Sequence, residues 1–385
     1  MKRMKVALSL IGAGLIGLGL VGLRSTLESK PVVKANKTDQ RIVRAMRVIE
    51  KLPNRAEGYN QLASAYMQKA RETADFELNK SAEDAITRSL AVEADNYDAL
   101  KLRAKLQLTY HRFLDALDTA RQAQTVRTDD HDVWGQITDA LVELGDYPGA
   151  VNAAQKMVDL RPDSSSYARV SYLRSLHGDT QGAIEAMTAA VKSANPNDPE
   201  AIAWCHVQLG NELINAGRRD AGEREFDEAL RVFPDHPLAL RAKAQARKDA
   251  GDIEAAIKIS EREGASADAA QMLGDLYALQ GRKDDALKQY EAFETLERKN
   301  AVRERSWRHM INYWLDHDRN LEEALTLATR EYETRKDIFT CDSLAWAFFK
   351  NGRIADARKL MSEALRTGTN DARIAHHAGI IQQIP

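Results

Sequence analysis

Histidine and cysteine side chains, which bind metals and act as bases or nucleophiles, are few and scattered in this sequence. Nine histidines are present, and the tightest groups are His376 with His377 and His309 with His317. Neither group has Cys, Asp or Glu neighbours at the spacing of a metal site. Adjacent histidines on a helix point about 100° apart, so one ion cannot easily bind both. We interpret these histidines as surface or cap residues and predict no metal and no cofactor.

Aromatic residues and histidines gather in one region, at Trp307, His309, Tyr313, Trp314 and His317. One hypothesis is that this region is an enzyme site or carries a metal or cofactor. The simpler interpretation is that the aromatic side chains fill a gap between helices. Elsewhere no serine lies in a Gly-x-Ser-x-Gly turn, and no cysteine lies beside a helix-starting glycine. We therefore predict no catalytic residue and no small-molecule substrate, and expect that the chain is not an enzyme.

Three glycines, Gly12, Gly14 and Gly17, have the Gly-x-Gly-x-x-Gly spacing of a dinucleotide-binding loop. That loop needs a preceding strand and a following amphipathic helix. These glycines instead lie inside an uncharged apolar run, residues 6–23. Because glycine is common in membrane helices, we interpret them as part of a membrane segment.

The N-terminal residues have the pattern of a signal-type anchor. Lys2, Arg3 and Lys5 precede the apolar run, whose length is at the short end for a membrane-spanning helix. No clear small-x-small cleavage site follows the run, and the positive charges before it should stay in the cytoplasm. We predict an uncleaved single-pass helix in the inner (cytoplasmic) membrane with the rest of the chain on the periplasmic side. Secretion after signal cleavage, or a cytoplasmic array, remain alternatives. The anchor residues are Val6, Leu10, Leu15, Leu20 and Leu23.

Composition favours helix and argues against a nucleic-acid partner. The chain has 55 basic and 57 acidic residues mixed along its length, for a formal net charge of -2. Nucleic-acid binding needs a basic stripe, which this mixing does not provide. Residues with high helix propensity dominate, while proline and aromatic residues are sparse. The sequence therefore predicts a nearly all-helical protein.

Glycines that end a helix recur about every 34 residues along most of the chain. Small residues recur in phase with them, because two helices can cross closely only where bulky side chains are missing. The turn glycines are Gly145, Gly178, Gly217, Gly251, Gly281 and Gly352. The small residues before them are Thr138, Ser171, Gly210, Ala244, Gly274 and Ala345, and those after them are Ala150, Ala183, Gly222, Ala256, Ala286 and Ala357.

These positions resemble the tetratricopeptide repeat, which has a Trp-Leu-Gly-Tyr row on its first helix, Ala and Phe on its second, and a closing Pro. One unit matches at Trp134, Leu141, Gly145, Tyr147, Ala150 and Pro162, and another at Leu209, Gly210, Leu213, Phe226, Ala229 and Pro234. The resemblance implies an all-α fold, a right-handed α-solenoid superhelix of about nine helix-turn-helix repeats. Since solenoid units contact only their neighbours, Cys205 and Cys341 are predicted to be buried, reduced thiols in repeats that do not touch.

The predicted organisation is an anchor at residues 1–23, a linker at residues 24–38 and a repeat array at residues 39–382. The array comprises a half repeat at residues 39–55, repeats at residues 56–370 and a terminal helix at residues 371–382. In the first repeat about ten extra residues predict a long inter-helix loop. The unit at residues 237–266 has a short second helix. The unit at residues 305–337 lacks the turn glycine and has His317, Asp318 and Asn320 in its place.

The resemblance implies that a partner peptide or protein binds in a concave groove lined by the first helix of each repeat. The predicted function is therefore a protein-binding scaffold, used in the assembly or maturation of envelope proteins. Polar residues expected to line the groove are Asn60, Ser64, Lys101, Lys105, Asp139, Asn211, Arg241, Gln245, Gln271 and Asp275.

Overall fold

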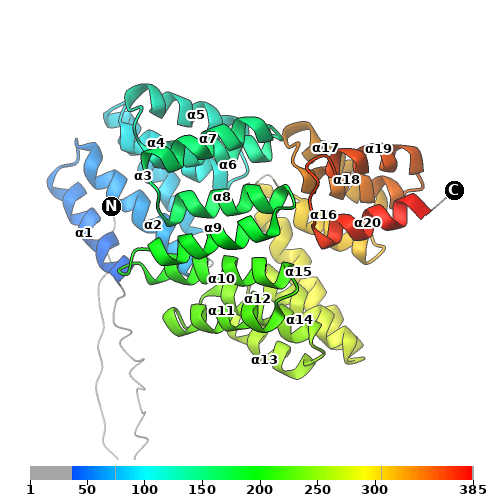
Figure 1. The fold of residues 1–385 in the computed structure, drawn as a ribbon. Helices are drawn as coiled ribbons and strands as arrows, with labels where there is room; N and C mark the ends of the chain where they lie inside the picture. The colour runs from blue at the N-terminus through cyan, green and yellow to red at the C-terminus, as the bar shows by residue number, and fades with distance from the viewer. Residues whose placement is uncertain (1–36, 74, 305, 384–385) are drawn as a thin grey trace, which may run out of the picture. The chain divides into compact units, whose positions relative to one another are not determined.

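The computed structural model describes residues 37–73, 75–304 and 306–383, which form twenty α-helices and no strand (Figure 1). These helices belong to one unit of the chain, Lys37–Pro385. The predicted anchor at residues 6–23 lies outside the described residues. None of the described helices combines the length and the apolar character that crossing a bilayer requires. The all-α prediction is confirmed.

The helices have the following bounds: α1 (Lys37–Lys51), α2 (Ala56–Thr73), α3 (Leu78–Val92), α4 (Tyr97–Thr109), α5 (Phe113–Val126), α6 (His131–Glu143), α7 (Tyr147–Leu160), α8 (Ser164–Leu176), α9 (Thr180–Ser193), α10 (Pro199–Asn215), α11 (Arg219–Val232), α12 (Pro237–Asp249), α13 (Ile253–Glu263), α14 (Ala267–Leu279), α15 (Lys283–Glu304), α16 (Arg308–Asp316), α17 (Leu321–Thr334), α18 (Ile338–Lys350), α19 (Ile354–Ala364) and α20 (Ala372–Gln383).

Consecutive helices pack as nine helix-turn-helix pairs, from α2 with α3 to α18 with α19, and α1 and α20 flank them. The first helices of successive pairs also contact one another, from α2 through α14 and again from α16 through α20. Few residues of α15 and α16 are in contact. The nine pairs therefore form two stacks, α1 to α15 and α16 to α20, with a thin joint between them.

In several pairs the turn follows from two adjacent residues, a glycine and an aspartate. Gly145 and Gly178 adopt φ values of 79° and 74°, a region that side chains disfavour. The aspartates that follow them cap the next helix, because Asp146 accepts a hydrogen bond from the Gly149 backbone N–H at 2.9 Å and Asp179 caps α9 in the same way. The Gly-Asp sequence therefore ends one helix and begins the next.

The α2–α3, α4–α5 and α16–α17 connections have no glycine. In the α16–α17 turn Asp318 and Asn320 have φ values of 52° and 45°, as the sequence predicted for that unit. In the α4–α5 turn His111 has a φ of 54°, which the sequence analysis did not anticipate. Burial, together with the Arg335 guanidinium, lowers the pKa of His111 to about 3. The α13 helix is short, as predicted.

The small residues lie where the paired helices cross. A Cβ atom added to Gly222 of α11 would lie 2.7 Å from the Gly210 carbonyl oxygen of α10. In the neighbouring pairs Ala150, Ala183 and Ala256 are fully buried. The backbones of a pair thus approach so closely that the crossing point has no room for a larger residue.

The extra residues of the first repeat do not form the predicted long loop. Instead they lengthen α2, which has 18 residues where α4 has 13. Arg71 lies on this extension, and its Nε is 3.3 Å from Glu200 Oε2 at the start of α10. Helix propensity continues through Ala70 and Arg71, so α2 does not end where the repeat pattern would end it.

Repeats far apart in the sequence contact each other, which corrects the expectation of neighbour-only contacts. The Tyr147 hydroxyl accepts a hydrogen bond from the Ile338 backbone N–H at 2.9 Å. The Asn370 side-chain amide donates to the Gly178 carbonyl oxygen, also at 2.9 Å. The turns of the first stack are therefore in contact with loops of the second.

Both cysteines are free and buried, as predicted. Burial raises the pKa of Cys205 to about 12, so this thiol is protonated at neutral pH.

We predict that replacing Gly222 by alanine destabilises the α10–α11 pair by about 1–3 kcal/mol, because the added methyl group meets backbone. The Gly379→Ala variant is the matched control, since nothing lies within 4 Å of a Cβ atom at Gly379 in α20. Alanine should there stabilise the helix by up to about 1 kcal/mol. Thermal unfolding followed by circular dichroism, with hydrogen exchange in α10 and α11, measures both effects. Equal effects of the two substitutions would show that the crossing is not tightly packed.

Candidate functional site

We call the surface formed by the polar side chains of the first helices the first-helix face; these helices are α2, α4, α6, α8, α10, α12 and α14. Many of these side chains connect one repeat to the next. These bridges join residues about one repeat apart, so the stacking of the first helices creates them. They include Lys69 with Asp39, Lys101 with Asp130, Asp139 with Arg169, Arg241 with Asp268 and Lys248 with Asp275. Most of the polar residues predicted to line the groove belong to this set or to similar contacts.

Asn60 lies between helices instead of projecting freely. It is 8% exposed, donates a hydrogen bond to Asn96 Oδ1 at 2.8 Å and accepts one from Ser89 Oγ at 2.7 Å. Asn96 in turn caps α4. Ser64, one turn along α2, is half-buried and accepts a hydrogen bond from Arg41. The expectation that Asn60 projects from the face is therefore wrong, because its amide satisfies buried polar groups.

Lys101 projects from α4 onto the start of α6. Its ammonium is 2.8 Å from a carboxylate oxygen of Asp130 and 2.8 Å from one of Asp132. Burial opposes the charge on each group, but the mutual hydrogen bonds outweigh it, raising the pKa of Lys101 and lowering that of Asp130 to about 2.

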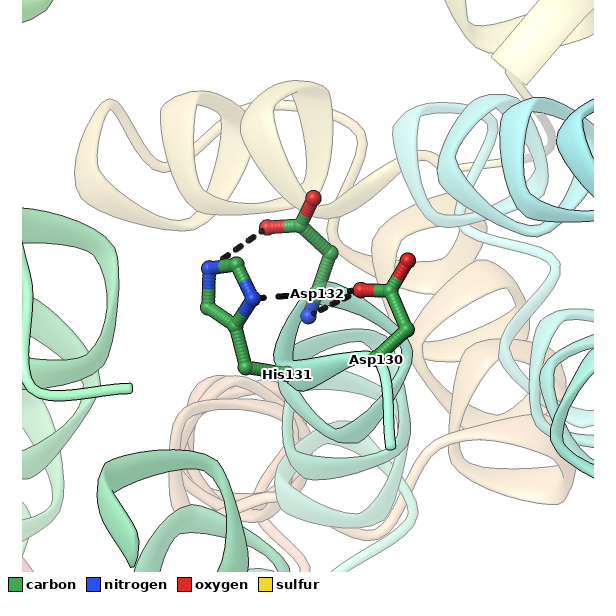
Figure 2. Close-up of side chains that lie close together, drawn as sticks. All are labelled: Asp130, His131 and Asp132. Carbon is green, nitrogen blue, oxygen red and sulfur yellow. Dashed lines mark hydrogen bonds and ion pairs between the residues drawn. The ribbon is translucent and has the colours of Figure 1, made fainter. Parts of the chain in front are cut away.

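Asp130, His131 and Asp132 point toward one another in Figure 2, and one ligand atom from each lies within 4.8 Å of the others. His131 Nε2 is also 3.1 Å from Asp163 Oδ2. The Lys101 ammonium already occupies the position of a cation between the two aspartates. The residue types fit an ion, but the cluster is complete as an ion-pair network, and the geometry assigns no metal to it.

Asp139 forms a two-pronged ion pair with Arg169 of α8. Its carboxylate oxygens lie 2.8 Å from Arg169 Nε and 2.6 Å from Arg169 Nη2. Arg169 also donates a hydrogen bond to the Gly135 carbonyl oxygen at 3.1 Å. This planar arrangement fixes both side chains, so Arg169 is a structural partner that the sequence analysis missed.

Arg241, Gln245 and Asp275 are also engaged. Arg241 Nη2 is 2.6 Å from a buried carboxylate, Glu263 Oε1. Gln245 is exposed and donates to Asp249 within the same helix. Asp275 accepts hydrogen bonds from Tyr290 Oη at 3.0 Å and Lys248 Nζ at 3.1 Å.

Three predicted residues remain free. Asn211 and Gln271 are half-buried and Lys105 is exposed, and none of their side chains makes a hydrogen bond or ion pair with another described residue. They are the predicted groove residues whose polar groups are available to a ligand.

A cleft of about 350 Å³ opens between α8 and α10, and we call it the α8–α10 cleft. Tyr172, Trp204 and Met187 line it together with the Asp139–Arg169 pair. Tyr172 is 41% exposed although it lies in the middle of a first helix. These residues were not predicted, because the groove prediction rested on polar residues alone; the aromatic residue in the middle of α8 was the available signal.

A charged cluster joins the two stacks. Arg308 Nη2 is 2.6 Å from Asp337 Oδ2, and Arg335 pairs with Glu143 at the end of α6. The Lys336 backbone N–H donates to the Glu143 carbonyl oxygen at 3.0 Å. Burial opposes ionisation of Asp337, but Arg308 and Arg335 outweigh it and lower its pKa. These charges are stable together because each has a partner.

Tyr313 and Trp314, in the aromatic region proposed as an alternative active site, are packed as core, whereas the His309 side chain is 41% exposed. Trp314 is fully buried and Tyr313 is 1% exposed. The His317 ring lies 4.6 Å from the Tyr313 ring, and His309 Nδ1 is 3.6 Å from Glu297. In the described part of the chain, neither histidine belongs to a group of three potential metal ligands. The packing agrees with the simpler interpretation of Tyr313 and Trp314.

His377 is not a surface or cap residue. It is 3% exposed, its Nδ1 is 2.9 Å from Asp342 Oδ1, and its ring stacks on Trp346 at 4.1 Å. His376 is exposed, as predicted. Only the packing of α20 on α18 distinguishes these two neighbours.

We predict that the Arg335→Leu variant loses about 1–3 kcal/mol of stability, because it leaves the half-buried Glu143 without its cation and removes one of two cations beside the buried Asp337. Hydrogen exchange should accelerate in the α6–α7 turn and the α17–α18 loop together. Arg330→Leu, an exposed position on the adjoining helix α17, is the control and should change neither. Unchanged exchange in the α6–α7 turn of Arg335→Leu would rule out a stabilising link between the stacks.

Comparison with known proteins identifies the repeat. The sequence model of the tetratricopeptide repeat matches residues 137–202 and 207–270. Protein FlbA of Caulobacter vibrioides is 39% identical over 99 residues, which cover 25% of this chain and 16% of FlbA. The matched stretch is thus a small part of that relative.

Solved structures share the fold. The Cut9–Hcn1 hetero-tetramer of the APC/C has a TM-score of 0.52 at 14% identity, covering 90% of this chain and 67% of the other. The human IFIT1 dimer with m7Gppp-AAAA has a TM-score of 0.54 at 14% identity, covering 85% and 76%. The family match falls on units with regular turn glycines and small crossing residues, and this part of the chain consists of tetratricopeptide repeats.

Proposed function

We propose that this protein is a non-catalytic scaffold that binds a peptide or protein partner along the first-helix face. The observation that carries the proposal is the series of ion pairs and hydrogen bonds linking one first helix to the next. Side chains that are already fixed lose little conformational entropy when a ligand arrives, so such a surface is prepared for binding.

The free groups on this face suit a polypeptide ligand. Lys105, Asn211 and Gln271 can hydrogen-bond to backbone or side chains, and the α8–α10 cleft can accept an apolar side chain. A few polar anchors around an apolar cavity are typical of ligand sites.

The charges on the face favour protein over nucleic acid. Lys101, Arg169 and Arg241 are paired with carboxylates of the same chain. Nucleic-acid affinity comes mainly from cations that neutralise phosphates, and these cations are already neutralised. The formal net charge of -2 points the same way.

We further propose that residues 6–23 anchor the chain in the inner membrane and that the array acts on the periplasmic side, in assembly or maturation of envelope proteins. The support is the uncharged run and the Lys2, Arg3 and Lys5 cluster before it. Secretion after signal cleavage is the alternative.

A photocrosslinking amino acid placed at Asn211 or Gln271 of the full chain, in cells, tests the binding face. We expect discrete crosslinked partners from these two sites. The same amino acid at Lys156, exposed on the second helix α7, is the control and should give none of the same bands. Crosslinks of equal pattern at all three positions, or none at the first two, would falsify the proposed face.

An alkaline phosphatase fusion after Lys37 tests the topology. We expect an active fusion that remains with the membrane fraction after carbonate extraction. An inactive fusion contradicts export, and active enzyme released from the membrane supports cleavage.

A further inference from the structure

Among the described residues, Lys105 has no ion-pair partner, although the charged groups around it are paired with one another. Part of the Lys105 side chain is exposed, while α2, α6, α8 and α10 surround the rest and bring charged groups toward it: Arg71, Asp132, Arg169 and Glu200. Arg71 pairs with Glu200 at 3.3 Å, and Arg169 pairs with Asp139 at 2.6 Å. Asp132 pairs with Lys101 at 2.8 Å.

Lys101 is shared by Asp130 and Asp132, so these charges and that of Lys105 balance in sum, but no described carboxylate lies within 4 Å of the Lys105 ammonium. Burial lowers the pKa of Lys105 to about 8, and the Arg71 guanidinium adds to the shift. Lys105 is therefore largely protonated at neutral pH, and its protonated form makes no ion pair with a described carboxylate. A ligand carboxylate would satisfy it.

The α8–α10 cleft is an opening suited to an apolar side chain. Arg169 lines this cleft and also lies within electrostatic range of Lys105, so the two features are neighbours on the same face. Tyr172 and Trp204 give the cleft aromatic walls, and Met187 at 1% exposure forms its base. Its two carboxylates are already engaged, because Asp139 pairs with Arg169 and Ser175 donates a hydrogen bond to Glu212 at 3.1 Å.

We propose that the partner segment is acidic and apolar: an aromatic or large aliphatic side chain enters the α8–α10 cleft, and a carboxylate close to it in the segment pairs with Lys105. This inference rests on the proposed binding face and specifies the chemistry of its ligand. Charge complementarity selects the acidic residue, since a basic segment would place a like charge beside Lys105, which has no ion-pair partner among the described residues.

The test begins with the purified full chain in nanodiscs and a phage library displaying random twelve-residue peptides. We expect enriched peptides that carry Asp or Glu close to Phe, Trp, Tyr, Leu or Met. The most enriched peptide is then synthesised with a fluorophore, and its affinity is measured by anisotropy.

Variants locate the contacts. Lys105→Glu and Tyr172→Ala should each weaken binding about tenfold or more, as loss of a central interface contact does. Lys156→Glu makes the same charge change on α7 and should leave affinity unchanged. Circular dichroism of each variant shows whether it is folded, and Lys105→Gln offers a milder change at the same site.

The protonation of Lys105 gives an independent readout. Because a bound carboxylate stabilises the protonated lysine, affinity should fall as the pH rises through about 8 to 9. The Lys105→Arg variant stays charged in this range and should keep its affinity. A wild-type affinity that is independent of pH, with Lys105→Gln binding equally well, overturns the assignment of Lys105.

The remaining outcomes separate the inference from the proposed function. Enriched peptides that are neutral or basic, and whose binding depends on Tyr172, contradict the acidic ligand but keep the face. If no peptide is enriched over empty nanodiscs, the result counts against both the acidic ligand and the proposed binding face. The crosslinking experiment then tests the binding face independently. Tight binding of a twelve-nucleotide adenine RNA that Lys105→Glu abolishes would overturn the peptide ligand.

Discussion

Close crossing of two helices within each repeat is the constraint on which the other features of this structure depend. At Gly210 and Gly222 the backbones approach so closely that no side chain fits between them. The crossing fixes the angle and distance within the pair, and therefore the position at which the next pair can stack. The spacing of the first helices, and with it the register of every bridge on the first-helix face, follows from these few small residues.

Once the first helices are stacked, their polar side chains meet at a fixed separation. The pairs Asp139–Arg169 and Lys248–Asp275 result from this regular stacking. Individually, partly exposed ion pairs contribute roughly 0–1 kcal/mol each. Their larger effect is to hold the face in one conformation and to leave a small number of groups free. Selectivity for a ligand therefore resides in the unpaired residues, of which Lys105 is the charged one among those predicted to line the groove.

The contact between the two stacks gives the protein a second source of stability. In an open solenoid each repeat depends only on its neighbours. Here the Glu143, Arg335, Asp337 and Arg308 cluster links α6 to α17 and α18. Removal of one member leaves a buried charge without a partner, so substitution of a single residue lowers the stability of this link more than a substitution in a hydrophobic contact would. It also spans the thin joint at α15 and α16.

The sequence by itself determined the helix pairs, their turns and their crossing points. These depend on local chemistry: glycine or another residue tolerant of positive φ in the turn, and a small residue at a fixed offset from it. The same local pattern placed Asp318 in the glycine-free turn and indicated that Tyr313 and Trp314 belong to the core.

Only the tertiary structure decided which polar residues are available. Asn60 and Lys105 both lie on first helices, yet one is buried by Asn96 and Ser89 while the other stays free. His376 and His377 differ for the same reason, since only His377 packs on Trp346. The extension of α2 toward Glu200 and the contact between the stacks also lay beyond the repeat pattern. Each of these features depends on residues that are distant in sequence and are brought together when the repeats stack. A periodic sequence pattern specifies the repeat, but it does not specify which side chains of other repeats will contact it.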